Sequence, residues 1–182
     1  EYNAKFNLTS ITDDEGIYEK HFADSLKGEE FFPYGANVLE VGSGGGFPSV
    51  PLKIAREDLK FTLTEATEKK CAYLKIVGEK LGFDNFSVIN GRAEELGKDE
   101  NYREKYDIVT ARAVARLNVL SEYCLPFVKI GGYFVAYKGD AEEEIKEALP
   151  AIEILGGKIE IIKKFVLSEK YGIRNIVVIK KI

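Results

Sequence analysis

Short apolar runs alternate with amphipathic segments along most of the chain. The apolar runs are bounded by glycine and polar residues, and they predict strands at residues 37–41, 60–65, 87–90, 107–111 and 131–138. The amphipathic segments predict helices at residues 47–57, 67–82, 117–129 and 140–155. Strands that alternate with helices indicate a mostly parallel sheet that is covered by helices on both faces.

The two ends of the chain depart from this alternation. Asp13 and Asp14 are residues of a type that caps helices, and the apolar stripe after them predicts a helix that runs to about Lys27. Two β-rich segments, 158–167 and 173–181, follow one another and predict a final hairpin. The sequence contains no internal repeat, low-complexity tract or linker, so we expect a single domain.

The segment between the first predicted strand and its helix carries the most chemical information. Four of the five residues from Gly42 to Gly46 are glycine. In such a turn a ligand can approach the backbone closely, because no Cβ atom stands in the way. Glu65 ends the second strand about 20 residues further on, where an acid can accept hydrogen bonds from the ribose of an adenosine-containing ligand.

Three kinds of ligand are compatible with a glycine-rich turn, and the surrounding residues favour one of them. A phosphate-binding P-loop ends in Gly-Lys-Ser/Thr, whereas Phe47 and Pro48 follow this loop. A dinucleotide-binding turn has the order G-x-G-x-x-G, and Phe47 or Ser49 stands at the third glycine. S-adenosylmethionine has no phosphate but carries a sulfonium and an amino group, so the acids Glu40 and Glu65 favour it.

Two further segments follow predicted strands and belong to the same crevice. Residues 90–95 follow the third strand, where a methyltransferase of class I contacts the adenine edge. Residues 110–114 follow the fourth, where such enzymes place residues beside the transferred methyl group. Ligands of open α/β sheets lie outside the carboxyl ends of the strands, so these loops are expected to converge.

Composition and charge limit the remaining possibilities. The net charge of −4 argues against nucleic-acid binding over the whole surface but leaves room for a local basic face. No apolar stretch reaches the roughly 18 to 20 residues that span a bilayer, and no signal peptide opens the chain. Cys71 and Cys124 lie far apart with no CxxC motif or histidine cluster, so we expect buried thiols, no metal and a cytoplasmic location.

The chain resembles the bacterial RsmG (glucose-inhibited division protein B) family. The resemblance rests on motifs that occur in the family's order: Asn-Ala-Lys-Phe-Asn-Leu-Thr-Ser at 3–10, His-Phe-Ala-Asp-Ser at 21–25, Val-Gly-Ser-Gly-Gly-Gly-Phe-Pro at 41–48 with Pro-Leu at 51–52, Gly-Arg-Ala-Glu at 91–94, Ala-Arg-Ala at 111–113 and Tyr-Lys-Gly at 137–139. It implies a class I, Rossmann-like, S-adenosylmethionine-dependent methyltransferase that acts on guanine N7 of 16S ribosomal RNA. The implied sheet has seven strands, mostly parallel, and ends in an antiparallel hairpin.

The resemblance also assigns roles to individual residues. Cofactor contacts are implied for Glu40, Gly42, Ser43, Gly44, Gly46, Phe47, Glu65, Ala93, Glu94 and Arg112. Catalytic roles are implied for Arg112, His21 and Asp24, and substrate contacts for Asn7, Thr9, Ser10, Pro48 and Lys138. Each has a structural alternative: His21 and Asp24 can pair within a helix, Arg112 can be an ion-pair partner, Lys138 can be a solvated strand end, and the polar residues near 7–10 can form only a turn and cap.

Within this family, we expect residues 1–30 to form a substrate-side segment and residues 36–182 the cofactor-binding core. The chain begins at Glu1 and contains no methionine, so we expect its natural N-terminus to precede this residue; the family's further N-terminal helical segment does not occur in it. Two residues differ from the usual family pattern: Glu65 replaces an aspartate, and Asn175 follows Arg174 where many members have histidine. The expected protein is a monomer whose partner is 16S ribosomal RNA, free or within an assembling small subunit, with no metal and no membrane.

Two other functions remain open on the sequence alone. A small-molecule methyltransferase with the same core would act on metabolites without RNA. A regulatory module would bind an adenine nucleotide without transferring a methyl group. The motifs from Asn3 to Ser25 favour the RNA substrate, because the cofactor-binding core alone does not require them.

Overall fold

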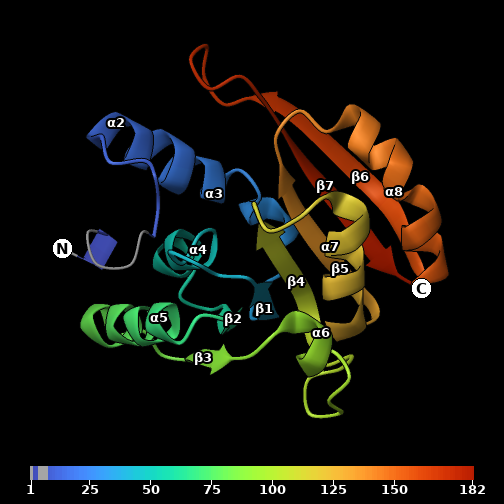
Figure 1. Cartoon of the computed structure of the whole chain (residues 1–182), viewed down its shortest axis with the longest axis horizontal. Helices are drawn as coiled ribbons and strands as arrows, with labels where there is room; N and C mark the ends of the chain where they lie inside the picture. Colours follow the sequence, from blue (N-terminus) through green and yellow to red (C-terminus); the bar gives the residue numbers. More distant parts are fainter. Residues whose placement is uncertain (1, 4–7) are drawn as a thin grey trace.

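A seven-stranded sheet forms the centre of the molecule in this computed structural model, which describes residues 2–3 and 8–182 (Figure 1). The strand order is β3-β2-β1-β4-β5-β7-β6. The strands are β1 (Asn37–Val41), β2 (Lys60–Glu65), β3 (Phe86–Asn90), β4 (Tyr106–Arg112), β5 (Val128–Lys138), β6 (Gly157–Val166) and β7 (Ile173–Lys181). The predicted seven-stranded, mostly parallel sheet with a C-terminal hairpin is thereby confirmed.

The direction of the strands places a crevice at the centre of one sheet edge. β1 pairs in parallel with β2 on one side and with β4 on the other, while β7 pairs antiparallel with both β5 and β6. The strand order reverses between β1 and β4, because the chain leaves β1 toward β2 and later returns to its other side. Open α/β sheets bind ligands at such a reversal, outside the carboxyl ends of the strands.

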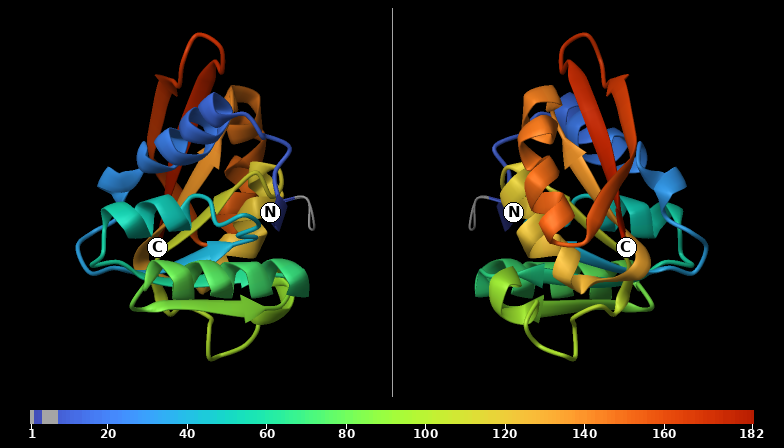
Figure 2. Two further views of the ribbon diagram at one scale, coloured as in Figure 1. Left: turned by 90° about the vertical axis from the view of Figure 1, so that its left-hand side faces the viewer. Right: turned by 90° about the vertical axis from the view of Figure 1, so that its right-hand side faces the viewer.

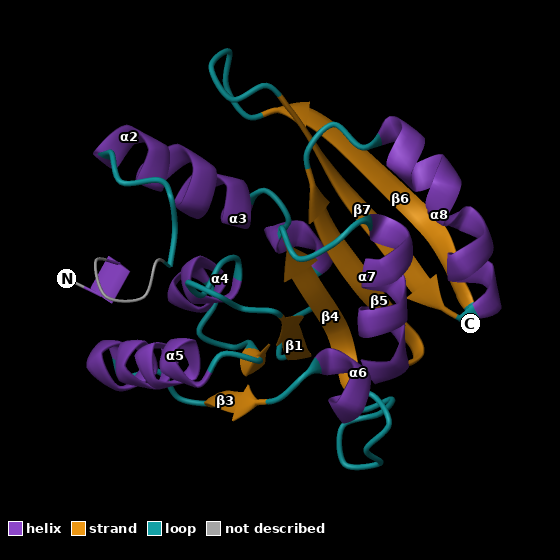
Figure 3. Ribbon diagram, in the orientation of Figure 1, coloured by secondary structure: helices purple, strands orange, loops and turns teal. Residues whose placement is uncertain are grey.

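Helices cover both faces of the sheet, as the alternation of strands and helices predicts (Figures 2 and 3). The helical elements are α2 (Asp14–Gly16), η1 (Ile17–Ala23), α3 (Asp24–Leu26), η2 (Glu29–Phe31), α4 (Ser49–Ala55), α5 (Glu68–Leu81), α6 (Ala93–Leu96), α7 (Leu117–Cys124), η3 (Leu125–Phe127) and α8 (Glu142–Ile154). Within β1, Leu39 packs in the apolar cluster with residues of α7 and α8, and Val38 packs with residues of α4 and α5. Because successive strand residues face opposite ways, β1 is buried on both faces.

Some predicted elements differ from the structure at their ends. The helix predicted at 47–57 is limited to α4, because Phe47 and Pro48 belong to the glycine turn and Arg56 leaves helical geometry with φ −133°. The helix predicted at 117–129 ends as α7, and a 3₁₀ turn that contains Pro126 leads directly into β5. Gly82 ends α5 in the left-handed conformation, with φ +62°, as predicted for a glycine after a helix.

The N-terminal helical segment runs from α2 through η1 to α3 and lies over the carboxyl end of the sheet (Figure 1). Its first turn is capped by Asp13, whose Oδ1 accepts a hydrogen bond of 2.8 Å from the backbone N–H of Gly16. Its central part is a π-helix, which the sequence did not predict. The hydroxyl of Tyr137 donates to the carbonyl of Ser25 at 2.8 Å, so this helix is fastened to β5.

Candidate active site

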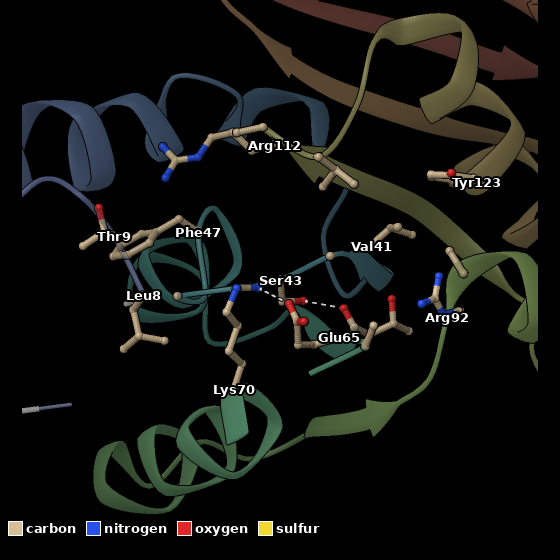
Figure 4. Close-up of a pocket in the computed structure, with 18 of the residues that line it drawn as sticks. Leu8, Thr9, Val41, Ser43, Phe47, Glu65, Lys70, Arg92, Arg112 and Tyr123 are labelled. Carbon is tan, nitrogen blue, oxygen red and sulfur yellow. Dashed lines mark hydrogen bonds between the residues drawn. The ribbon is translucent and has the colours of Figure 1, made fainter. Parts of the chain in front are cut away.

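A cavity of about 660 Å³ opens at the carboxyl ends of β1, β2, β3 and β4 (Figure 4). Its volume lies within the range of ligand pockets in proteins, roughly 300–1,000 Å³. The glycine loop after β1 forms its floor, and the loops after β2, β3 and β4 form three of its walls. Residues 8–11 and His21 close the remaining side, so the N-terminal segment completes the pocket.

The glycine loop adopts a conformation that requires glycine at Gly42. Its φ angle is +68°, and a Cβ atom added there would lie 2.7 Å from Cγ2 of Val114. Gly44 and Gly46 also have positive φ angles, of +52° and +89°. The loop can therefore bring its backbone against the side chain of Val114 and against a bound ligand.

Most of the loop's backbone N–H groups already donate to protein acceptors. Those of Gly42 and Ser43 donate to the carbonyl of Thr64 at 2.9 and 3.0 Å. The N–H of Gly46 donates to the carbonyl of Ser43 at 2.7 Å, and that of Gly44 donates to a carboxylate. A phosphate-binding loop instead points several N–H groups at its anion. This loop consequently suits a ligand without phosphate.

The carboxylate that accepts from the loop is that of Glu65 at the end of β2. Its Oε2 accepts from the N–H of Gly44 at 3.0 Å (Figure 4). Its Oε1 accepts from the N–H of Thr67 at 2.9 Å. Each carboxylate oxygen has two lone pairs, so each can still accept one hydroxyl from the pocket. Glu65 thus retains the capacity to accept hydrogen bonds from two hydroxyls of a ligand, and its contact with ribose stays a prediction.

Glu40 lies behind the glycine loop and does not line the cavity. It is completely buried, and its Oε2 accepts from the N–H of Ser49 at 3.3 Å. Its Oε1 has no hydrogen-bond partner among the described residues. Burial raises the pKa of Glu40 to about 7, since the charged form loses its hydration there. Contact between Glu40 and a cofactor therefore stays a prediction.

Arg112 connects the end of β4 to the N-terminal helix. Its Nη1 donates to the carbonyl of Lys20 at 2.7 Å and to Oδ2 of Asp24 at 3.1 Å, and its Nη2 lies 3.0 Å from Nδ1 of His21. Burial raises the pKa of Asp24, and the Arg112 cation opposes that rise. Arg112, Asp24 and His21 thus form a cluster that joins two segments about 90 residues apart in the chain, and the side chain of Arg112 is mostly buried there.

His21 is the only histidine of the chain and is uncharged at neutral pH. Burial and, next in size, the neighbouring Arg112 cation together lower its pKa to about 4. Its ring stacks on Phe47 with a centroid distance of 4.4 Å and an interplanar angle of 13°. Its Nε2 lies 2.8 Å from Oγ1 of Thr9. One imidazole ring therefore connects Arg112, the glycine loop and the N-terminal segment.

The cavity brings together most of the residues that the sequence proposed for the site. Those that line it are Thr9, Ser10, His21, Gly42, Ser43, Gly44, Phe47, Glu65, Ala93, Glu94 and Arg112. Those that lie outside its lining are Asp24, Glu40, Gly46, Pro48 and Lys138. Asn7 lies outside the described residues. The roles assigned to all of these residues stay predictions, although the first group has the position that its roles require.

The side chain of Lys138 is mostly buried, although a solvated strand end was one alternative for it. Its Nζ donates to the carbonyl of Ala115 at 2.8 Å and forms an ion pair of 2.6 Å with Glu144. Ala115 belongs to the loop that follows β4, in which Ala113 has a φ angle of +57°, and Glu144 also accepts from the backbone N–H of Leu117, where this loop ends. Lys138 thus supports the pocket wall from behind, and nothing in its contacts favours a direct role in substrate binding.

The sequence analysis missed several residues of the pocket, among them Lys70, Arg92 and Tyr123. Arg92 lies within the Gly-Arg-Ala-Glu segment at 91–94, so its position after β3 was a usable signal. Lys70 lies in the first turn of α5, five residues after Glu65, where a side chain can turn back toward the glycine loop (Figure 4). Among the described residues there is no group of three potential metal ligands. No helix in the described part of the chain is long and apolar enough to cross a membrane.

Comparison with known proteins gives a consistent result. The model of the GidB family, described as rRNA small subunit methyltransferase G, matches residues 1–177. The "Ribosomal RNA small subunit methyltransferase G" of Brevibacillus brevis is 48% identical, over 100% of this chain and 78% of that protein. The protein of the same name from Clostridium novyi is 47% identical, over 100% of this chain and 76% of that protein.

Solved structures share the fold at low sequence identity. A SAM dependent methyltransferase from Aquifex aeolicus has a TM-score of 0.65 and 22% identity, and the match covers 91% of this chain and 94% of that chain. Precorrin-6y C5,15-methyltransferase from Geobacter metallireducens has a TM-score of 0.62 and 13% identity, and the match covers 94% and 90% of the two chains. These likenesses confirm the fold class that the sequence predicts.

Proposed function

The chain belongs to the GidB family, rRNA small subunit methyltransferase G, and we propose that it transfers the methyl group of S-adenosylmethionine to N7 of a guanine in 16S ribosomal RNA. It is a methyltransferase by membership of this family. The cofactor-binding residues, the guanine N7 target and a cytoplasmic location are parts of the proposal. The 16S RNA substrate follows from the name that the relatives carry.

The hydrogen bonds of the glycine loop carry the proposal. The N–H groups of Gly42, Ser43, Gly44 and Gly46 donate to protein oxygens, so the loop offers few donors to a phosphate. The carboxylate of Glu65 is fixed by two backbone N–H groups and keeps one lone pair on each oxygen, which supports its proposed contact with a pair of hydroxyls. A ligand with ribose but no phosphate fits both features, and S-adenosylmethionine is such a ligand. The same observation counts against a regulatory module that binds adenine nucleotides through their phosphates.

The residues of the pocket are arranged to hold reactants rather than to move protons. When it is bound, S-adenosylmethionine supplies a methyl group whose bond to sulfur breaks, with its electron pair left on sulfur, as the N7–carbon bond forms. Guanine N7 has a free lone pair at neutral pH, so the protein does not need to supply a base. His21 is uncharged there and its ring nitrogens face Arg112 and Thr9. The contribution of the protein is therefore orientation of the reacting atoms.

The substrate must reach the pocket with N7 accessible. In an RNA helix N7 lies in the deep major groove, which side chains cannot readily enter. The target guanine is consequently expected in a loop or turned out of its stack. A chain of net charge −4 binds RNA through a local basic surface, and a folded RNA or an assembling small subunit would present its phosphates to that surface. A monomer is sufficient for this arrangement, since one chain supplies all the walls of the cavity.

Transfer of a labelled methyl group tests the proposal. Three parallel reactions contain the protein and labelled S-adenosylmethionine. The first has unmodified 16S RNA as the substrate, the second has small subunits, and the third has an RNA-free metabolite extract. We expect label in the RNA or in the subunits, and about a tenth of that amount with Glu65→Gln at a cofactor concentration well below the KM. Label in metabolites alone would support a small-molecule methyltransferase. Cofactor binding without any transfer would support a regulatory module.

A further inference from the structure

The proton positions in the cluster around His21 follow from its partners. An arginine has only N–H groups and cannot accept, so Nη2 of Arg112 donates to Nδ1 of His21 across their 3.0 Å separation. Nδ1 must then carry no proton. Because the ring is neutral at pH 7, its single proton lies on Nε2, which therefore donates to Oγ1 of Thr9 at 2.8 Å.

This assignment determines what the hydroxyl of Thr9 can do. Its oxygen has two lone pairs, and it accepts from Nε2 of His21 and from the N–H of Ile11 at 3.1 Å. Both lone pairs are occupied. The hydroxyl proton remains, and it has no protein acceptor among the described residues. Arg112 and His21 together thus convert Thr9 into a hydrogen-bond donor only, on the wall of the cavity.

Thr9 lies at the end of the cavity where the glycine loop meets the N-terminal segment. The carbonyl of Leu8 comes within 3.8 Å of a Cβ position built on Gly45, so the segment lies directly over the loop. Phe47 and Arg112 lie beside Thr9 at the same end (Figure 4). Glu65, the proposed ribose ligand, and Ala93 and Glu94, for which the family resemblance implies adenine contacts, lie on other walls. The Thr9 end of the cavity is therefore left for the methyl group and its acceptor.

We propose that the hydroxyl of Thr9 donates a hydrogen bond to O6 of the target guanine and so selects guanine against adenine; this inference rests on the proposed function. Guanine presents two acceptors side by side, N7 and O6. N7 must keep its lone pair for the methyl group, which leaves O6 for the donor. Adenine has the same N7 but an amino donor in place of O6. Thr9 has no free lone pair to accept from that amino group.

Selection by a fixed donor is strong, because the wrong base leaves polar groups unpaired. A site that is built to hydrogen-bond one substrate group rejects an analogue that lacks it more effectively than an apolar pocket does. His21 acts here as a positioning residue, since it holds the orientation of the hydroxyl without touching the base. Arg112 acts one step further back by fixing the proton of His21 on Nε2.

Two variants and two RNAs test this inference. Thr9→Val keeps the shape of the side chain and removes the hydroxyl, and Thr9→Ser keeps the hydroxyl. The substrates are 16S RNA fragments that carry either guanine or 2-aminopurine at the methylated position; 2-aminopurine retains N7 and lacks O6. We expect Thr9→Val to lower kcat/KM on the guanine RNA about tenfold or more, and Thr9→Ser to remain within about threefold of wild type.

The comparison on 2-aminopurine separates base recognition from a structural effect. Wild type and Thr9→Val should transfer to this RNA at equal rates within about twofold, because no O6 is present to accept. If these rates are too slow to measure, dissociation constants of the two RNAs replace them. An equal loss for Thr9→Val on both RNAs, no loss on either, or a change only in the KM for S-adenosylmethionine would overturn the inference. Failure of the wild-type protein to methylate the guanine RNA would instead refute the proposed function.

Discussion

Replacement of Arg112 by methionine removes the cation that joins β4 to the N-terminal helix. Methionine retains much of the apolar stem of arginine but none of its N–H groups. The change leaves Asp24, whose side chain is 10% exposed, without the guanidinium that lies 3.1 Å from its Oδ2. Removal of one partner of a buried ion pair costs about 3–5 kcal/mol. Nε of Arg174 remains 3.9 Å from Oδ1 of Asp24, so we expect a loss of stability at the lower end of this range, about 3 kcal/mol.

The loss of stability should depend on pH. Burial raises the pKa of Asp24 and Arg112 opposes that rise, so the variant's folded-state pKa is higher still. When the pKa of a carboxyl is higher in the folded state than its unfolded value of 3.8, the protein loses stability as the pH rises from the unfolded pKa to the folded one. Arg112 also helps to lower the pKa of His21, so without it the folded variant binds a proton more readily below pH 6.5. Both groups make the deficit of Arg112→Met smaller as the pH falls toward 4.

Urea unfolding monitored by circular dichroism measures this deficit at pH 7.5 and pH 4.5. The double variant Arg112→Met, Asp24→Asn provides the control, because it removes the unpaired carboxylate as well. We expect the double variant to recover at least about half of the stability lost at pH 7.5 and to show a smaller change in the deficit with pH than the single variant, with the remaining change due to His21. A deficit of equal size at both pH values, with no recovery in the double variant, would refute the role given to the Arg112–Asp24 pair.

Three further changes probe the glycine loop and the two acids beside it. Gly42→Ala should weaken S-adenosylmethionine binding, measured by calorimetry, about tenfold or more, because its Cβ would lie 2.7 Å from Cγ2 of Val114 at a φ of +68°. Val114→Ala in the same chain should restore part of the affinity. Unchanged binding in Gly42→Ala would contradict the close approach of the loop to Val114. Glu65→Gln places an NH₂ group opposite a backbone N–H that donates to the carboxylate in the wild-type protein. The KM for the cofactor should therefore rise about tenfold, with kcat on RNA little changed. An unaltered KM would exclude Glu65 as a ribose ligand. Burial raises the pKa of Glu40 from 4.5 to about 7, so its contribution to the stability of the fold falls as the pH rises from 4.5 to 7. The stability of Glu40→Gln minus that of wild type should therefore be larger at pH 8 than at pH 5 in urea unfolding. An equal difference at both pH values would show that Glu40 does not titrate in this way.

The sheet could be predicted from the sequence because its central strands are buried on both faces. Val38 and Leu39 face opposite clusters, so neighbouring residues of β1 are both apolar, and the predicted range 37–41 is confirmed to the residue. The helix boundaries were less certain because they depend on turn chemistry. α6 is only four residues long, which is too short for a helical period to be visible in the sequence.

The position of the site could also be predicted, since it follows from strand ends, but its hydrogen bonds could not. Glu40 and Glu65 both lie at or near the ends of their strands, yet Glu40 is buried outside the lining of the cavity and Glu65 forms part of its wall. Arg112 joins partners about 90 residues away in the chain, and no local pattern specifies such a contact. The π-helix that turns His21 toward Arg112 likewise leaves no recognisable period in the sequence.

Transfer to RNA in which guanine N7 is absent tests the central claim most directly. Transcripts of the same 16S sequence are made with guanosine or with 7-deazaguanosine, which has a C–H group in place of N7. Each is incubated with the protein and labelled S-adenosylmethionine, and the label in the RNA is counted. The proposed function predicts transfer to the guanosine transcript and none to the 7-deazaguanosine transcript. Equal labelling of both transcripts would contradict it.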